Sequence, residues 1–165
     1  MDRDELRATQ GPLKQQYRDD ASSAVITLHA DGTLGEAQTC SVATGRALVE
    51  AGLHPATGGT GLSACSGDML LQALVACAGV TMMSVATSMD IEVTGTVRAE
   101  GILDFRGTLG VDKEAPVGFQ DIRLTFDVDS DAPPDALATL LRLTERYCVV
   151  LQTLTSAPHL HAAYA

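Results

Sequence analysis

The fold depends most on residues 68–90, DMLLQALVACAGVTMMSVATSMD, which carry an aspartate at each end and no charged residue between them. A run this long and apolar is typical either of a membrane-spanning helix or of a helix buried in a protein core. The flanking acids, the Gln, Thr and Ser content and the lack of Lys or Arg anchors argue against membrane insertion. We therefore predict a buried helix and no association with a membrane.

This helix is too long to be covered by a single layer of the same chain. At about 1.5 Å per residue it would extend over roughly 30 Å, close to the width of a domain of this size. A helix that is apolar all round needs cover on every face, and one sheet covers only one face. The sequence therefore predicts that a second copy of the chain closes over the helix in a homodimer.

Runs of β-branched and apolar residues lie on both sides of the helix and predict strands. These runs are residues 23–30, 34–44, 91–103, 105–111 and 119–128, and residues 46–53 and 159–165 are compatible with two more strands. Asp31-Gly32 is typical of a hairpin turn between the first two runs. In the last run, the alternating residues Ile122, Leu124, Phe126 and Val128 share one face. We expect an antiparallel meander.

The segments between and after these strands complete an α+β domain. Residues 54–67 form a glycine-rich loop, and Pro133-Pro134-Asp135 begins a second helix that continues through residues 145–154. The residues predicted on one face of this helix are Leu137, Leu140, Leu141, Thr144 and Tyr147. We assign a single domain to residues 21–165.

The first twenty residues form a separate arm. They are polar, and Gly11-Pro12 is expected to break them into a short helix and a further segment. Such an arm has no core of its own, so it needs another part of the protein to lie on.

Composition and charge exclude several classes of function. The chain has 165 residues, 45% of them hydrophobic, and a formal net charge of −10. Nucleic acid and anionic membranes are poor partners for it, because it has no cluster of Lys and Arg. Residues 1–7 lack the basic and then apolar layout of a secretory signal, so we expect a cytoplasmic protein without structural disulfides.

The four cysteines are Cys40, Cys65, Cys77 and Cys148, and they form no CxxC or Cys/His pattern with zinc spacing. We therefore expect no metal and no cofactor, and the cysteines are either inert core residues or redox-active thiols. In the apolar middle of the long helix, Cys77 should have a raised pKa unless a cation lies close. Cys148 falls either at the end of the second helix or at the start of a further turn.

Four sequence features occur in an order that resembles one known family. They are the loop Gly58-Gly59-Thr60-Gly61, the pattern S-G-D-x-L-L-x-A-L-x-x-C from Ser66 to Cys77, the pattern GF-x-x-I-x-L from Gly118 to Leu124, and the late helical Cys148. From about residue 23 to the end, the chain is similar to the OsmC/Ohr family, the osmotically inducible and organic hydroperoxide resistance proteins.

The resemblance implies an intertwined homodimer in which antiparallel sheets wrap around two central helices. It also implies a thiol-dependent peroxidase of oxidative stress defence. Cys77 would attack an organic hydroperoxide and become a sulfenic acid, and Cys148 would resolve it as a disulfide. An external dithiol reductant, often a lipoyl group in this family, would restore the thiols.

The sequence departs from the family's peroxidase pattern at three places. Gly67 stands where the family has a glutamate, with Ser66 in place of the preceding proline; no arginine occurs in the turn at residues 29–34; and Val149 replaces the proline after the second cysteine. This last change is compatible with a continuous helix through Cys148, which would remove activation by a helix dipole.

These departures leave two questions open. The candidates for the missing cation are Arg18, Arg46 and Arg146, of which we favour Arg46, and Cys65 is an alternative resolving thiol. The alternative function is a non-catalytic dimer that binds a small apolar ligand at the subunit interface, with its thiols merely buried. The paired cysteines favour the enzyme, whereas the departures favour the binding module.

Overall fold

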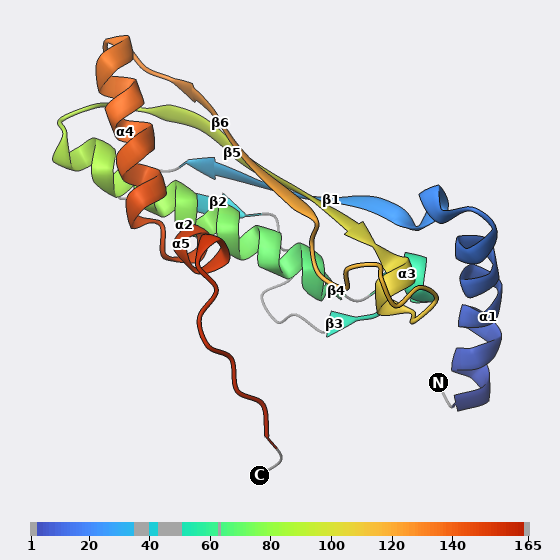
Figure 1. Cartoon of the computed structure of the whole chain (residues 1–165). Coiled ribbons are helices and arrows are strands. Elements are labelled where there is room, and N and C mark those ends of the chain that lie inside the picture. The colour runs from blue at the N-terminus through green and yellow to red at the C-terminus, as the bar shows by residue number, and fades with distance from the viewer. Residues whose placement is uncertain (1–2, 35–39, 43–50, 63, 164–165) are drawn as a thin grey trace.

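The long helix lies along one face of an antiparallel sheet in the computed structural model, which describes residues 3–34, 40–42, 51–62 and 64–163 (Figure 1). The elements in chain order are α1 (Arg3–Asp19), η1 (Ala21–Ala24), β1 (Val25–Leu34), β2 (Cys40–Val42), β3 (Ala51–Gly52), η2 (Pro55–Thr57), β4 (Ala64–Cys65), α2 (Ser66–Ser88), β5 (Thr94–Asp104), α3 (Phe105–Thr108), β6 (Asp121–Asp129), α4 (Pro134–Tyr147) and α5 (Val149–Thr155). Helices α4 and α5 pack against α2, and α1 lies at the far end beside α3.

The main sheet has four strands in the order β2-β1-β5-β6, and every neighbouring pair is antiparallel. The central ladder runs from Val25 opposite Asp104 to Thr33 opposite Thr96. In β6 the residues predicted to share a face are half-buried against the core, and the residues between them are exposed. The α+β class and the alternation of β6 are therefore confirmed.

The predicted hairpin turn at Asp31-Gly32 is wrong. Both residues lie inside β1, where they pair with Arg98 and Val97 of β5. The long ladder with β5 overrides the local turn preference, because each pairing in it satisfies backbone groups that a turn would leave unpaired. The returning strand is the short β2, and the connection at residues 35–39 lies outside the described residues.

The expected strand at residues 46–53 does not extend the main sheet in its described part. Ala51–Gly52 forms β3, which pairs in parallel with β4 in a separate two-stranded sheet. The rest of this segment, residues 43–50, lies outside the described residues.

Helix α2 buries one face within the chain and exposes part of the other. Its buried residues are Leu71, Leu74, Val75, Ala78, Gly79, Met82, Val85 and Ala86, which pack into the core. On the outer side Met69 and Leu70 are each 37% exposed and Val80 is 40% exposed. By length and composition alone α2 could cross a membrane, but here its inner face is the centre of the domain core. Within one chain, the predicted burial on all faces is not met.

The expected strand at residues 105–111 is wrong, because the chain forms α3 there. The Asp104 carboxylate accepts a hydrogen bond from the Arg106 amide at 3.0 Å and so caps the new helix. A side chain at Gly107 would meet the Pro116 carbonyl oxygen at 2.5 Å. The backbone at Pro116 therefore packs tightly against α3.

The C-terminal part differs from expectation in three ways. The residues predicted to share one face of α4 differ in burial, because Leu140 and Thr144 are buried whereas Leu141 and Tyr147 are exposed in the chain. The second helix does not continue through residues 145–154, because it ends at Tyr147 and α5 begins at Val149. The compatible strand at residues 159–165 is not formed in its described part, which has no regular structure.

The N-terminal arm is one continuous helix, so the predicted break at Gly11-Pro12 is wrong. Both residues are exposed, where water can hydrogen-bond to the carbonyl group that the proline leaves without a donor. The arm lies on the segment after β3: Tyr17, only 3% exposed, donates its hydroxyl to the Ala56 carbonyl at 2.6 Å. Gln10 donates to the Thr57 carbonyl at 3.1 Å.

Candidate active site

The two cysteines singled out by the sequence meet where α2 passes the junction of α4 and α5. Cys77 lies in the middle of α2 and is half-buried against the core. Cys148 is fully buried, at 0% exposure, between the two C-terminal helices. The two thiols lie close enough for each to affect the pKa of the other. The fold therefore brings together residues separated by about half of the domain sequence.

A break in the backbone at Cys148 creates this junction. Its φ of −70° and ψ of 107° are extended, which ends α4 and makes Cys148 the N-cap residue of α5. Its amide still donates to the Thr144 carbonyl, and its carbonyl accepts from the Gln152 amide, both at 2.9 Å. Cys148 therefore lies at a fresh helix start, and the first amides of α5 are directed at Cys77.

Burial and hydrogen bonding oppose each other at Cys77, and hydrogen bonding prevails. Burial raises the pKa of this thiol, but hydrogen bonds from the Val150 amide, the Cys148 thiol, the Thr81 hydroxyl and the Val149 amide lower it below the usual 9.0. All of these donors are neutral. The raised pKa expected for Cys77 is therefore not found, whereas the part of the expectation that concerns a nearby cation is not tested, because Arg46 lies outside the described residues.

Cys148 has the opposite electrostatic balance. Its pKa is raised to about 11, and burial is the largest cause. The hydrogen bond and charge of Cys77 also raise this pKa, whereas hydrogen bonds from the Leu151 and Val150 amides lower it in part. At neutral pH Cys148 thus keeps its proton. The pair consists of one thiol poised to ionise and one that stays neutral.

Comparison with known proteins identifies the family. Residues 59–162 match the family model for OsmC-like proteins. This chain belongs to the OsmC-like family. The match confirms the resemblance that the loop, the α2 pattern and the two cysteines predicted.

A solved structure shares the OsmC-like fold. The crystal structure of an OsmC-like hydroperoxide resistance protein from Jannaschia sp. CCS1 aligns with a TM-score of 0.59 over 86% of this chain and 95% of that chain, at 16% sequence identity. No curated protein matches the sequence significantly. At this identity, the likeness shows the fold alone.

The other predicted site residues do not join the thiol pair within the described OsmC-like chain. Arg46 lies outside the described residues. Arg18 is exposed on α1, and Arg146 is exposed with its guanidinium 5.6 Å from the ring centre of Tyr147. Cys65 is the N-cap residue of α2, about 18 Å along the helix from Cys77, which is too far for a disulfide within one chain. Cys40 lies in β2.

Two hollows are lined in part by residues of the helices that carry the thiol pair, although neither Cys77 nor Cys148 is among their described lining residues. One, of about 400 Å³, is lined by Val80, Thr81, Ser84, Val85, Ser88 and Tyr147. The other, of about 290 Å³, is lined by Leu74, Phe119, Gln120, Asp121, Ile122, Leu124, Leu151, Leu154 and Thr155. Both combine apolar walls with a few polar groups, as small organic ligands require. In the described part of the chain, no three His, Cys, Asp or Glu side chains are grouped to hold a metal ion.

Sequence reasoning missed the donors to Cys77. The amides of Val149 and Val150 serve as donors only because the backbone breaks at Cys148, and no residue there signals a break. Thr81 did carry a signal, because a residue four positions after Cys77 lies on the same helix face.

Proposed function

We propose that this protein is a thiol-dependent peroxidase that reduces organic hydroperoxides, with Cys77 as the attacking thiol and Cys148 as the resolving thiol. The observation that carries the proposal is the meeting of Cys77 on α2 with Cys148 at the junction of α4 and α5, where each thiol affects the pKa of the other in the opposite direction. The shared fold with a protein described as a hydroperoxide resistance protein supports it.

In the first step the Cys77 thiolate attacks one oxygen of the hydroperoxide. The S–O bond forms as the O–O bond breaks, the alcohol leaves after taking up a proton, and Cys77 becomes a sulfenic acid. The donors around Cys77 raise the fraction of thiolate at neutral pH, which is the nucleophilic form.

In the second step Cys148 attacks the sulfenic sulfur. A disulfide forms and water leaves. The water contains the sulfenic OH group and the proton of Cys148. The charge of Cys77 is one cause of the high pKa of Cys148, and this charge disappears when Cys77 is oxidised. Oxidation of the first thiol therefore makes the second easier to ionise. An external dithiol then reduces the disulfide.

We also propose that the protein is a homodimer. The outer side of α2 exposes apolar residues, and Leu141, Tyr147 and Val149 are exposed beside it at 39%, 56% and 71%. Exposed apolar side chains on neighbouring helices are typical of a subunit interface. Sedimentation at micromolar concentration should give twice the chain mass of 17.2 kDa, and a stable monomer would exclude the dimer.

The test of the peroxidase is consumption of hydroperoxide by the protein with a dithiol reductant. Because the hollows have apolar walls, a bulky alkyl hydroperoxide should react faster than hydrogen peroxide, and mass spectrometry should then find a Cys77–Cys148 disulfide. If both thiols stay reduced under excess oxidant, the peroxidase is excluded and the protein is a ligand-binding dimer. Equal or reversed rates would exclude the preference for alkyl substrates.

A further inference from the structure

The turn between α4 and α5 consists of a single residue, Cys148. This residue is the N-cap of α5, but its side chain makes no capping hydrogen bond. Its extended backbone separates two helices that both pack against α2 (Figure 1). A change in the angle between α4 and α5 would therefore change the backbone dihedral angles of Cys148, and with them the direction of its thiol.

The side chain of Gln152 crosses this turn. Its Nε2 donates a hydrogen bond to the Glu145 carbonyl at 2.9 Å, from α5 back to the last turn of α4. The Glu145 carbonyl is one of the last four of α4, which have no partner within their own helix. The backbone amide of Gln152 donates to the Cys148 carbonyl, also at 2.9 Å. Gln152 thus bonds Cys148 through its backbone and α4 through its side chain.

The other polar side chains of α5, a helix that the structure describes in full, bond within that helix. The Thr153 hydroxyl donates to the Val149 carbonyl at 2.8 Å, and the Thr155 hydroxyl donates to the Gln152 carbonyl at 3.2 Å. Such bonds to the carbonyl of an earlier residue are common for threonine in a helix. They do not constrain the angle between α4 and α5, whereas the bond from Gln152 to Glu145 does.

Apolar packing alone would leave this angle less well defined. Leu151 and Leu154 on α5 pack against the core, but such contacts have no preferred direction, whereas a hydrogen bond does. Cys148 is fully buried, so its thiol has to point at Cys77 before the two can bond. A disulfide accepts only a narrow range of geometries, and a displacement of about 1 Å can slow a reaction roughly a hundredfold.

We propose that Gln152 is a positioning residue for the resolving thiol: its side chain fixes the angle between α4 and α5 and so directs Cys148 at Cys77 before the disulfide forms. The inference rests on the proposed function for its role in turnover, but the alignment of the two thiols is independent of any peroxide. Without this hydrogen bond, disulfide formation has to order a junction that is already ordered in the wild-type protein. The disulfide is then less favourable.

The test is the equilibrium between the dithiol and the Cys77–Cys148 disulfide in mixtures of reduced and oxidised glutathione at high salt, with the bridged peptide measured by mass spectrometry. One oxidised glutathione takes up two electrons and two protons from the thiols and becomes two reduced glutathione molecules. Gln152→Met keeps an unbranched side chain of similar length and helix propensity but removes the donor. Its equilibrium constant for disulfide formation should be roughly fivefold lower, the factor that corresponds to one neutral hydrogen bond.

Three variants control this experiment. Gln152→Lys supplies a new donor for the Glu145 carbonyl and should restore the wild-type constant, because high salt screens the added charge. Thr153→Ala removes a hydrogen bond within α5, and Gln15→Met makes the same change on α1, where Gln15 donates to Asp19 at 2.9 Å. Both should leave the constant unchanged. Equal constants for wild type and Gln152→Met, no restoration by Gln152→Lys, or an equal fall in Thr153→Ala would overturn the proposal.

Hydroperoxide consumption separates this inference from the proposed function. If Gln152→Met lowers the constant but wild type consumes no hydroperoxide, Gln152 positions the thiol and the peroxidase is excluded. If wild type consumes hydroperoxide and the two constants are equal, the peroxidase stands and Gln152 has no such role. If wild type forms no Cys77–Cys148 disulfide at any glutathione ratio, both this inference and the resolving role of Cys148 are overturned.

Discussion

Asp104 and Cys77 are both acids with lowered pKa values, but they are stabilised in different ways. Asp104 is 2% exposed and bonded by the Arg106 guanidinium, at 2.6 to 3.1 Å, and by its amide. The side-chain hydrogen bonds of Arg106 are the largest cause that lowers its pKa. Cys77 is half-buried, and its described donors are neutral. A cation thus fixes a structural acid, whereas neutral donors leave a thiolate accessible.

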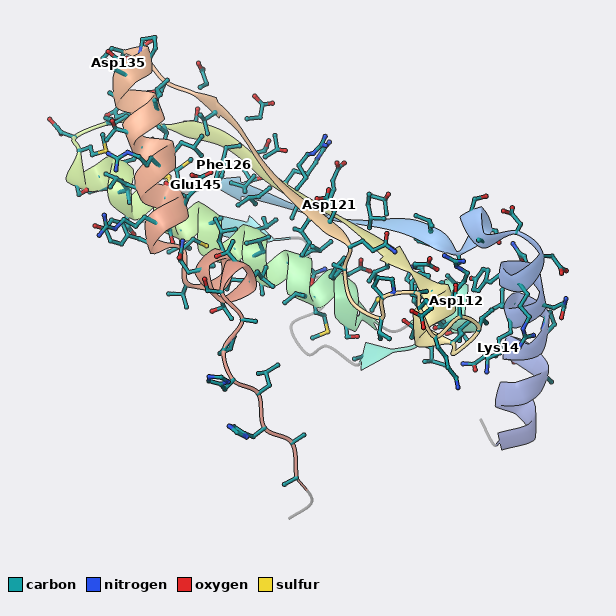
Figure 2. The ribbon with its side chains drawn as sticks, viewed as in Figure 1. Lys14, Asp112, Asp121, Phe126, Asp135 and Glu145 are labelled. Carbon is teal, nitrogen blue, oxygen red and sulfur yellow. The ribbon has the colours of Figure 1, made fainter. Side chains whose placement is uncertain are left out.

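The two acids also lie in different parts of the molecule. Figure 2 shows Asp112, which Arg106 also bonds, at the end beside α3 and α1, and Glu145 on α4, the helix that leads to the thiol pair. In the first region α3 packs against α1. In the second region, the helices that carry the thiols line part of two hollows. We therefore expect changes in the first region to affect stability and changes in the second to affect chemistry.

Replacement of the two thiols should give the largest and most different effects. Cys77→Ser should reduce dithiol-dependent hydroperoxide consumption to background, because the nucleophile is lost. Cys148→Ser should still form one sulfenic acid at Cys77 per chain on a single exposure to oxidant, but then fail to turn over efficiently. Steady-state assays and mass spectrometry of each oxidised variant measure both outcomes. If Cys148→Ser loses the single reaction and Cys77→Ser retains it, the two roles are reversed.

Asp104→Asn should lower stability without changing the chemistry. The loss of charged hydrogen bonds to a buried carboxylate should cost about 2 kcal/mol, or roughly 6 °C in Tm. Because the folded pKa of Asp104 lies below its ordinary value of 3.8, its stabilising effect is complete above that pH and is lost as the pH falls through the folded pKa. Thermal unfolding should therefore show a difference at pH 7 that shrinks below about pH 3.8.

The control for Asp104→Asn is the curve of the Cys77 alkylation rate against pH, which should coincide with that of wild type. A shift in that curve would mean that the two regions are coupled, and the contrast between a structural and a reactive acid would not hold.

Arg46→Ala should give the smallest effect on Cys77. The neutral donors already outweigh burial, so the pKa of Cys77 should stay below 9.0 in this variant. Arg46 remains our predicted contributor to turnover, which the rate of hydroperoxide consumption tests separately. A rise in the pKa of Cys77 to 9.0 or above would show that the cation, and not the neutral donors, stabilises the thiolate.

Sequence predicted the features that depend on long or repeated patterns. The uncharged run of α2 and the alternation in β6 extend over many residues, so several side chains support the same secondary-structure prediction. The family resemblance paired Cys77 with Cys148, which no local pattern could do. These features place the thiols, but they do not determine how each one ionises.

The failures occur where tertiary contacts override local preferences. Asp31-Gly32 has the composition of a turn but lies in a ladder with β5, and Gly11-Pro12 lies inside an exposed helix. The break at Cys148 is followed by a valine and not by a proline, and its backbone conformation decides which amides reach Cys77. Whether burial or hydrogen bonding prevails at a thiol depends on such donors, so the pKa of Cys77 could not be predicted from the sequence.

The most direct test of the two thiol roles is a site-resolved titration of the wild-type protein. Alkylation of the reduced protein is measured at Cys77 and Cys148 separately, by mass spectrometry, across the pH range. Cys77 should ionise below the ordinary thiol value of 9.0 and Cys148 near 11. If Cys148 ionises first, or if Cys77 ionises at or above 9.0, Cys77 is not the activated nucleophile.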